Sequence, residues 1–199
     1  LDPHQRVLLE TTYHALESAG WLAQEQLPET HEWSLSRDIT GCFIGMNAPD
    51  YPLNLACHPA SPYTGFGMLR SFAAGRLSHH FGWTGPSHTI DTACSSAMVA
   101  IHQACQAILA GECTRAVAGG VNLITNTALF DALRTGGFLS ETGPCKTFDA
   151  RADGYCRGEA VGILVLKPLS RALQDGDEIH GVLLGTGNNQ NINNTSITN

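Results

Sequence analysis

Hydrophobic positions follow a helical period in several stretches of the chain. In residues 3–20, apolar side chains recur every three or four positions, and Gly20 marks the expected end of a helix. The same period predicts helices at 68–83, 95–112, 126–137 and 170–177. The polar stretch 22–36 predicts a linker, and the proline-rich stretch 48–63 predicts an irregular segment.

Short apolar runs alternate with these helices and predict strands. They lie at 39–46, 87–93, 114–125, 159–170 and 178–189. The runs are nearly continuous in apolar residues and glycine, as in strands whose two faces are both covered. The alternation therefore predicts a layered α/β fold with helices on both faces of a sheet. No shift in composition marks a domain boundary within 1–199.

Composition and charge exclude some classes of binding partner. Of the 199 residues 43% are hydrophobic, enough to bury a core, and the formal net charge is −7 with only 11 Lys and Arg. Such a chain does not favour nucleic acid or an anionic membrane, because phosphates bind clustered positive charge. No apolar run approaches the roughly 20 residues that cross a bilayer. We therefore expect a soluble, cytoplasmic protein.

The seven cysteines form no CxxC pair. A disulfide framework or a structural zinc site needs paired spacing, so we expect free thiols in a reducing compartment, mostly packed in the core. The sequence also lacks GxGxxG, P-loop and HExxH patterns, so it predicts no metal site and no cofactor-binding site. Overlapping Asn-x-Ser/Thr sequences begin at Asn193 and Asn194. They are interpreted as ordinary polar loop residues rather than as glycosylation sites.

One cysteine, Cys94, lies where a predicted strand turns into a predicted helix. In the stretch HTIDTACSSAM, residues 88–98, the strand pattern ends and small residues surround the thiol. The N-terminus of a helix offers free N–H groups and a positive dipole end, which favour a thiolate and polarise a substrate carbonyl. The pattern leaves two interpretations open: a nucleophile on a sharp turn, or one more small buried side chain.

Polar residues near Cys94 are candidates for supporting roles. Four histidines are local candidates for a general base: His79, His80, His88 and His102. Histidines in such positions are more often structural than catalytic. Asp91 is expected to cap backbone N–H groups of the turn rather than to move protons. The helix after Cys94 has a single polar arc around Gln103, which predicts a helix buried on most sides.

Several longer stretches together resemble the ketosynthase (β-ketoacyl synthase) domain of modular and iterative polyketide synthases. In chain order they are DPHQRVLLE, GPSHTIDTACSSAMVAIHQACQAILAGE, AVAGGVNL, CKTFDARADGYCRGEAVGILVLKPLSRAL and GTGNNQN, and they span essentially the whole chain. The sequences SHHFGWTGPSHTIDTACSS and DGYCRGE are most similar to those of fungal iterative synthases. The non-reducing type is one candidate, and the subclass stays open.

The resemblance implies a thiolase-like layered α/β fold and a homodimer in the intact protein. It implies that Cys94 is the active-site cysteine, which accepts an acyl chain from the phosphopantetheine arm of an acyl carrier protein. A malonyl extender on that carrier then loses carbon dioxide and condenses with the Cys94 thioester. The implied partners are the acyl carrier protein and acyltransferase domains of the same synthase, with no cofactor bound directly.

The chain departs from the family pattern in one respect. The His-Gly-Thr-Gly-Thr and Lys-Ser-Asn-x-x-x-His motifs, which hold the family's two catalytic histidines and its lysine, do not occur in residues 1–199. We therefore expect an N-terminal half of a ketosynthase, trimmed at both ends, with the nucleophile but not the decarboxylation residues. Two alternatives stay open: another thiolase-fold condensing enzyme, of the fatty-acid or chalcone-synthase kind, or a non-catalytic structural segment.

Overall fold

The fold is built around a four-stranded sheet. A computed structural model describes residues 1–22, 38–47 and 50–190. The strands are β1 (Thr40–Met46), β2 (Ser87–Ile90), β3 (Arg115–Asn122) and β4 (Ala160–Leu166). Their order is β2-β1-β3-β4, in which β1 is parallel to β2 and β3, and β4 is antiparallel to β3. All four lie inside runs that the sequence predicts as strands.

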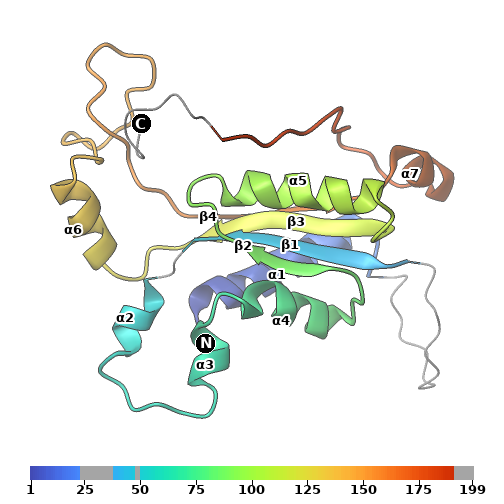
Figure 1. Ribbon diagram of the computed structural model, residues 1–199, viewed down its shortest axis with the longest axis horizontal. Helices are drawn as coiled ribbons and strands as arrows, with labels where there is room; N and C mark the ends of the chain where they lie inside the picture. Colours follow the sequence, from blue (N-terminus) through green and yellow to red (C-terminus); the bar gives the residue numbers. More distant parts are fainter. Residues whose placement is uncertain (23–37, 48–49, 191–199) are drawn as a thin grey trace.

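Helices cover both faces of this sheet, which confirms the predicted α/β class (Figure 1). α1 (Pro3–Ser18) and α4 (Phe72–Phe81) pack on one face, and α5 (Ser96–Leu109) packs on the other. Four shorter helices lie outside these layers: α2 (Tyr51–Leu55), α3 (Thr64–Met68), α6 (Ala128–Thr135) and α7 (Leu169–Asp175). The helices and the sheet of the described residues therefore form three layers, with α5 alone on its face of the sheet.

The two faces of the sheet carry different side chains because successive residues of a strand point to opposite faces. On β1, Cys42, Ile44 and Met46 pack with Leu8 and Leu77 in the layer of α1 and α4. Facing α5, the buried cluster is mostly alanine: Phe43, Ala100, Ala104, Ala107, Cys113, Ala116 and Ala118. Small side chains on both surfaces let α5 lie close to the sheet.

The N-terminal stretch ties α1 to the end of β3. The Asp2 carboxylate caps α1 by accepting the N–H of His4, and it also accepts a bond of 2.6 Å from Nδ1 of His4. The other ring nitrogen, Nε2, accepts the backbone N–H of Leu123 at 2.9 Å. Because Nε2 accepts, the ring hydrogen sits on Nδ1. This buried His4 therefore bridges the first residues of the chain and the carboxyl end of β3.

Two predicted elements are wrong in their extent. The helix expected over 68–83 begins later, as α4 at Phe72, because Met68 is the last residue of α3 and the chain is extended at Leu69. Gln5 explains the break, since its side-chain amide donates to backbone oxygens of this segment, including that of Leu69. The proline-rich stretch 48–63 is not wholly irregular either, since it contains α2.

The strand expected at 178–189 is absent from the structure. A strand needs a hydrogen-bonded neighbour, and this segment instead runs from α7 along the outer side of α5 without pairing to a strand (Figure 1). There the Thr186 hydroxyl lies 2.8 Å from Nδ1 of His102. Alternating apolar residues are therefore not sufficient to form a strand.

The prediction that α5 is buried on most sides is also wrong. Its inward stripe of alanines is buried, but Met98 is 68% exposed and Leu109 is 79% exposed. The reason is that within the described residues only one sheet packs against α5, so its outer face has no second layer. Most of the predicted linker 22–36, and the sites at Asn193 and Asn194, lie outside the described residues.

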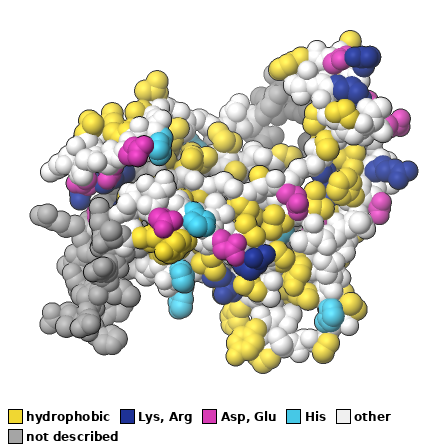
Figure 2. Space-filling model, turned by 180° about the vertical axis from the view of Figure 1, so that it is seen from behind, with side chains coloured by type: hydrophobic (Ala, Val, Ile, Leu, Met, Phe, Trp, Pro, Cys, Tyr) yellow, Lys and Arg dark blue, Asp and Glu magenta, His cyan; other side chains and the backbone are white. Residues whose placement is uncertain are grey.

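The distribution of charged side chains on the surface agrees with the low content of Lys and Arg (Figure 2). On the face shown in Figure 2, Lys and Arg side chains lie among acidic ones and form no continuous basic area. Within residues 1–22, 38–47 and 50–190, no helix is long and apolar enough to span a membrane.

Candidate active site

The three parallel strands end at one edge of the sheet, and the candidate site lies there. β1 ends at Met46, β2 at Ile90 and β3 at Asn122, and the Cys94 turn follows β2 directly. In open α/β sheets, ligands bind at the carboxyl ends of the strands. The position of Cys94 therefore matches the place where such folds bind their ligands.

The turn that carries Cys94 is held by hydrogen bonds within residues 91–96. The Asp91 carboxylate accepts the N–H of Ala93 at 3.1 Å, which confirms its expected capping role. The remaining bonds link Thr92, Ser95 and Ser96 through their hydroxyls and backbone groups. Ala93 has a φ of 54°, a left-handed conformation that a residue with a Cβ rarely adopts. Cys94 thus lies in a constrained turn, immediately before Ser95, the N-cap of α5.

Cys94 is exposed at this turn, which rules out a buried side chain at this position in the structure. The prediction for the other six cysteines is only partly right. Cys42 and Cys113 are buried and Cys105 is half-buried, and in each of the three burial raises the thiol pKa, to about 12 for Cys42. The other three are exposed because they lie in loops: Cys57, Cys145 and Cys156.

Two glycines that the sequence analysis did not single out bring the helix to the sheet. A Cβ on Gly45 of β1 would lie 2.4 Å from the backbone nitrogen of Ala97, in the first turn of α5. A Cβ on Gly120 of β3, the register partner of Gly45, would lie 2.7 Å from the Cβ of Ala97. Only glycine fits both positions. The signal in the sequence is one glycine near the end of each of the two apolar strands.

The candidate bases are not brought to Cys94. No hydrogen bond or ion pair joins Cys94 to a histidine among the residues that the structure describes. His88 packs edge-on against Phe43, with ring centroids 5.5 Å apart. His102 pairs with Thr186, while His79 and His80 are on the last turn of α4, on the opposite face of the sheet. These four histidines are structural or surface residues in this chain.

The stretch CKTFDARADGYCRGE belongs to a long loop that returns to the same edge of the sheet. The Asn122 side chain donates to the backbone oxygen of Gly158 at 2.6 Å, and the Glu159 carboxylate accepts the N–H of Ile124 at 2.6 Å. Within the loop, Lys146 forms an ion pair with Asp153. The loop thus joins the carboxyl end of β3 to the start of β4, at the edge that carries Cys94.

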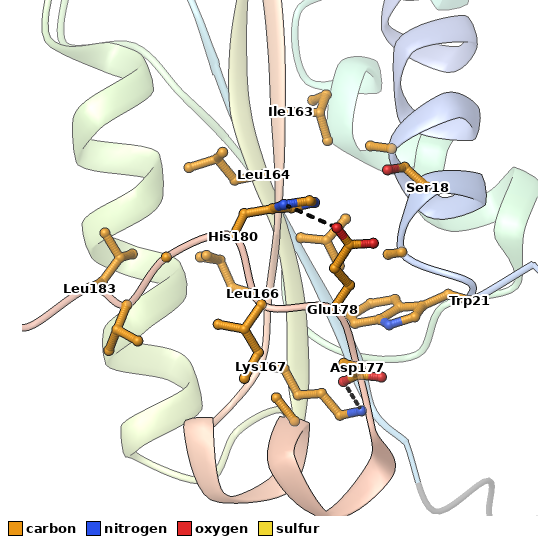
Figure 3. Close-up of a pocket in the computed structure, with 17 residues that line it drawn as sticks. Ser18, Trp21, Ile163, Leu164, Leu166, Lys167, Asp177, Glu178, His180 and Leu183 are labelled. Atoms are coloured by element: carbon orange, nitrogen blue, oxygen red, sulfur yellow. Dashed lines mark hydrogen bonds and ion pairs between the residues drawn. The ribbon is translucent and has the colours of Figure 1, made fainter.

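A cavity among the described residues lies elsewhere. It has a volume of about 500 Å³ and is lined by the end of α1, by β4 and by residues 177–183 (Figure 3). Lys167, paired with Asp177 at 2.6 Å, and Trp21 lie at its border. β4 is antiparallel to β3, and Leu166 pairs with Ala116 at the start of β3. The cavity is therefore at the opposite end of the sheet from Cys94. No group of three metal-binding side chains occurs in the described part of the chain.

Residues 1–172 match the family model described as "Beta-ketoacyl synthase, N-terminal domain". The chain therefore belongs to the β-ketoacyl synthase family of condensing enzymes. It is 54% identical over 197 residues to clavatol synthase of Penicillium crustosum, and 52% identical over 196 residues to a non-reducing polyketide synthase of Emericella nidulans. These matches cover 98–99% of this chain but only 7–8% of the relatives. Within its family, the chain is a ketosynthase of the polyketide synthase type.

Solved structures agree with this assignment. The ketosynthase from module 6 of the bacillaene synthase of Bacillus subtilis 168 is similar over 100% of this chain and 32% of its own, with a TM-score of 0.85 and 34% identity. The oxazolomycin ketosynthase domain of Streptomyces albus is similar over 89% of this chain and 29% of its own, with a TM-score of 0.75 and 38% identity. The predicted thiolase-like fold and polyketide class are confirmed.

Proposed function

We propose that Cys94 is the nucleophile of a condensing reaction in a multidomain, non-reducing polyketide synthase. The observation that carries the proposal is an exposed thiol on a constrained strand-to-helix turn, in a chain of ketosynthase type. The sulfur attacks the acyl thioester on the phosphopantetheine arm of an acyl carrier protein. The bond from acyl carbon to carrier sulfur breaks, and the carrier thiol is released.

The second half of the reaction forms the carbon–carbon bond. A malonyl thioester on the carrier loses carbon dioxide, and the resulting enolate attacks the Cys94 thioester. The Cys94 thiolate leaves, and the carrier holds a β-ketoacyl chain two carbons longer. The family resemblance assigns decarboxylation to two histidines and a lysine in motifs outside residues 1–199. No cofactor is bound directly in this scheme, and the partners are the carrier and acyltransferase domains and a second copy of the synthase.

The geometry of the turn limits which groups can stabilise the oxyanion. The N–H groups of Ala93, Ser95 and Ser96 donate inside the turn, so they are not directed at a substrate. We therefore assign this role to the N–H of Cys94 itself, which adjoins the attacking sulfur. A backbone donor fixed next to the nucleophile needs no reorganisation during the reaction.

Acylation of the intact synthase tests the proposal. The enzyme is incubated with an acyl-pantetheine thioester, and the adduct is located by peptide mass spectrometry. We expect the acyl group on Cys94 and its loss in Cys94→Ala. Cys145→Ala, which removes another exposed thiol, is the matched control and should retain the adduct. Acylation of another cysteine with Cys94 unmodified would favour the non-catalytic alternative.

A further inference from the structure

We propose that Arg70 is a positioning residue for Cys94 and acts through Asp91. The inference rests on the proposed role of Cys94 and adds a residue that holds the nucleophile without touching the substrate. Arg70 lies in the short connection between α3 and α4, far from the DTACSS stretch in the sequence. In the structure its guanidinium forms an ion pair with the Asp91 carboxylate.

Asp91 uses its two carboxylate oxygens for two different partners. One oxygen, Oδ1, accepts the N–H of Ala93, and the other, Oδ2, pairs with Arg70. Ala93 is the left-handed residue directly before Cys94, and a side-chain acceptor for its N–H holds it in that conformation. Arg70 therefore fixes the rotamer of the carboxylate that fixes the backbone before the nucleophile.

The connection that carries Arg70 is itself anchored from α1. The backbone N–H of Asp2 donates to the oxygen of Gly67 at 2.8 Å, and the buried Gln5 amide donates to oxygens of residues 66, 67 and 69 at 3.4–3.5 Å. Arg76 of α4 donates to Gln5 Oε1 at 2.6 Å and to the oxygen of Phe66 at 2.9 Å. The backbone just before Arg70 is thus held from both α1 and α4, which fixes the position from which the Arg70 side chain extends.

The exposure of the pair suits a positioning role better than a stabilising one. The side chain of Arg70 is 41% exposed and that of Asp91 is 34% exposed. Ion pairs at such exposure contribute little to folding stability. Loss of Arg70 should therefore leave the fold intact and change the placement of the turn, which acts on the reaction rate.

The test measures Cys94 acylation by an acyl-pantetheine thioester in the intact synthase. We expect Arg70→Met to lower kcat for acylation about tenfold, because a misplaced nucleophile loses near-attack geometry, while KM changes less than about twofold. Arg70→Lys keeps the charge and should recover most of the rate. Arg6→Met removes a similar exposed pair, with Glu10 on α1, and should acylate at the wild-type rate.

A double-mutant cycle tests whether Arg70 acts through Asp91. Asp91→Asn keeps an oxygen for the Ala93 N–H but removes the charge that pairs with Arg70. We expect Arg70→Met/Asp91→Asn to be no slower than the slower single variant, since both remove one interaction. An unchanged kcat in Arg70→Met, no recovery in Arg70→Lys, or multiplicative effects in the double variant would overturn the inference. Wild-type enzyme that is not acylated at Cys94 would instead overturn the proposed function.

Discussion

At the scale of single residues, burial and local hydrogen bonds decide which groups are reactive. Seven thiols share one chemistry, yet Cys42 lies in the core under α4 while Cys94 is exposed at a turn. Burial raises the pKa of Cys42 to about 12 against a smaller, opposing effect of a hydrogen bond from Ser78. The environment of each thiol, and not the residue type, therefore separates a buried core thiol from an exposed one.

This difference predicts the labelling pattern of the folded protein. With a pKa of about 12, Cys42 is thiolate in only about one molecule in ten thousand at pH 8. We expect iodoacetamide to label Cys94 in the intact synthase and to leave Cys42 unlabelled until urea is added. Peptide mass spectrometry gives the site of each adduct. Equal rates for Cys42 and Cys94 in the folded state would contradict the burial of Cys42.

Asp50 gives a residue-scale prediction about pH. Burial acts to raise its pKa, but the Thr125 hydroxyl and the N–H groups of Asn126 and Thr125 outweigh this effect, so the pKa lies below its usual value. A lowered pKa in the folded state stabilises the fold above the unfolded value of about 3.9. That stability is lost as the pH falls through the folded value.

We therefore expect Asp50→Asn to lower the free energy of unfolding by about 1–3 kcal/mol at pH 7. The difference from the wild type should shrink as the pH falls from about 4 through the lowered pKa of the folded state, because Asp50 is protonated first in the unfolded chain and then in the folded one. Urea titrations at several pH values measure it. Asp131→Asn on the exposed helix α6 is the control for loss of charge. A difference that stays constant down to pH 2 would exclude the ionised carboxylate as the cause.

At the scale of secondary-structure elements, the site depends on how closely α5 approaches the sheet. The first turn of α5 rests on Gly45 of β1 and Gly120 of β3, at the edge where both strands end. The alanines of α5 continue the same close contact along the helix. The position of Cys94 relative to the sheet is therefore set by small residues on two adjacent strands.

Adding one methyl group at this contact should disturb the site. In Gly45→Ala the new Cβ meets backbone atoms of Ser96 and Ala97 at 2.4 Å, which cannot rotate away as a side chain would. We expect a loss of about 3 kcal/mol, seen as a lower midpoint of urea unfolding, together with slower acylation of Cys94. Gly162→Ala in β4 is the matched control, because its Cβ enters open space. Equal midpoints for the two variants would contradict the close packing of α5.

At the scale of the whole molecule, the chain is much shorter than the proteins that it matches. The chain spans 32% of the solved bacillaene ketosynthase and 7–8% of the fungal relatives. Its α5 has apolar side chains on the outer face, and Leu184 in the neighbouring segment is 96% exposed. Apolar surface of this kind is typical of a face that further protein covers.

Residues 1–199 expressed alone should therefore bind a hydrophobic dye. We expect 8-anilinonaphthalene-1-sulfonate fluorescence to rise with this segment and not with a chain extended to the full length of the ketosynthase domain. Leu109→Gln, on the exposed side of α5, should reduce the signal of the segment, because it removes apolar surface. An equal signal from the extended chain would mean that the remainder of the domain does not cover this face.

The sequence by itself determined the local elements, the family and the candidate nucleophile. The periods of apolar residues predicted all four strands, and a cysteine between a strand pattern and a helix pattern predicted the Cys94 turn, because these features depend on residues close together in the chain. Tertiary structure alone decided the break at Leu69, the missing strand at 178–189 and the contact between Arg70 and Asp91. Each of these depends on groups brought together from distant parts of the chain, or on the absence of a hydrogen-bonding neighbour, and no local pattern encodes such contacts.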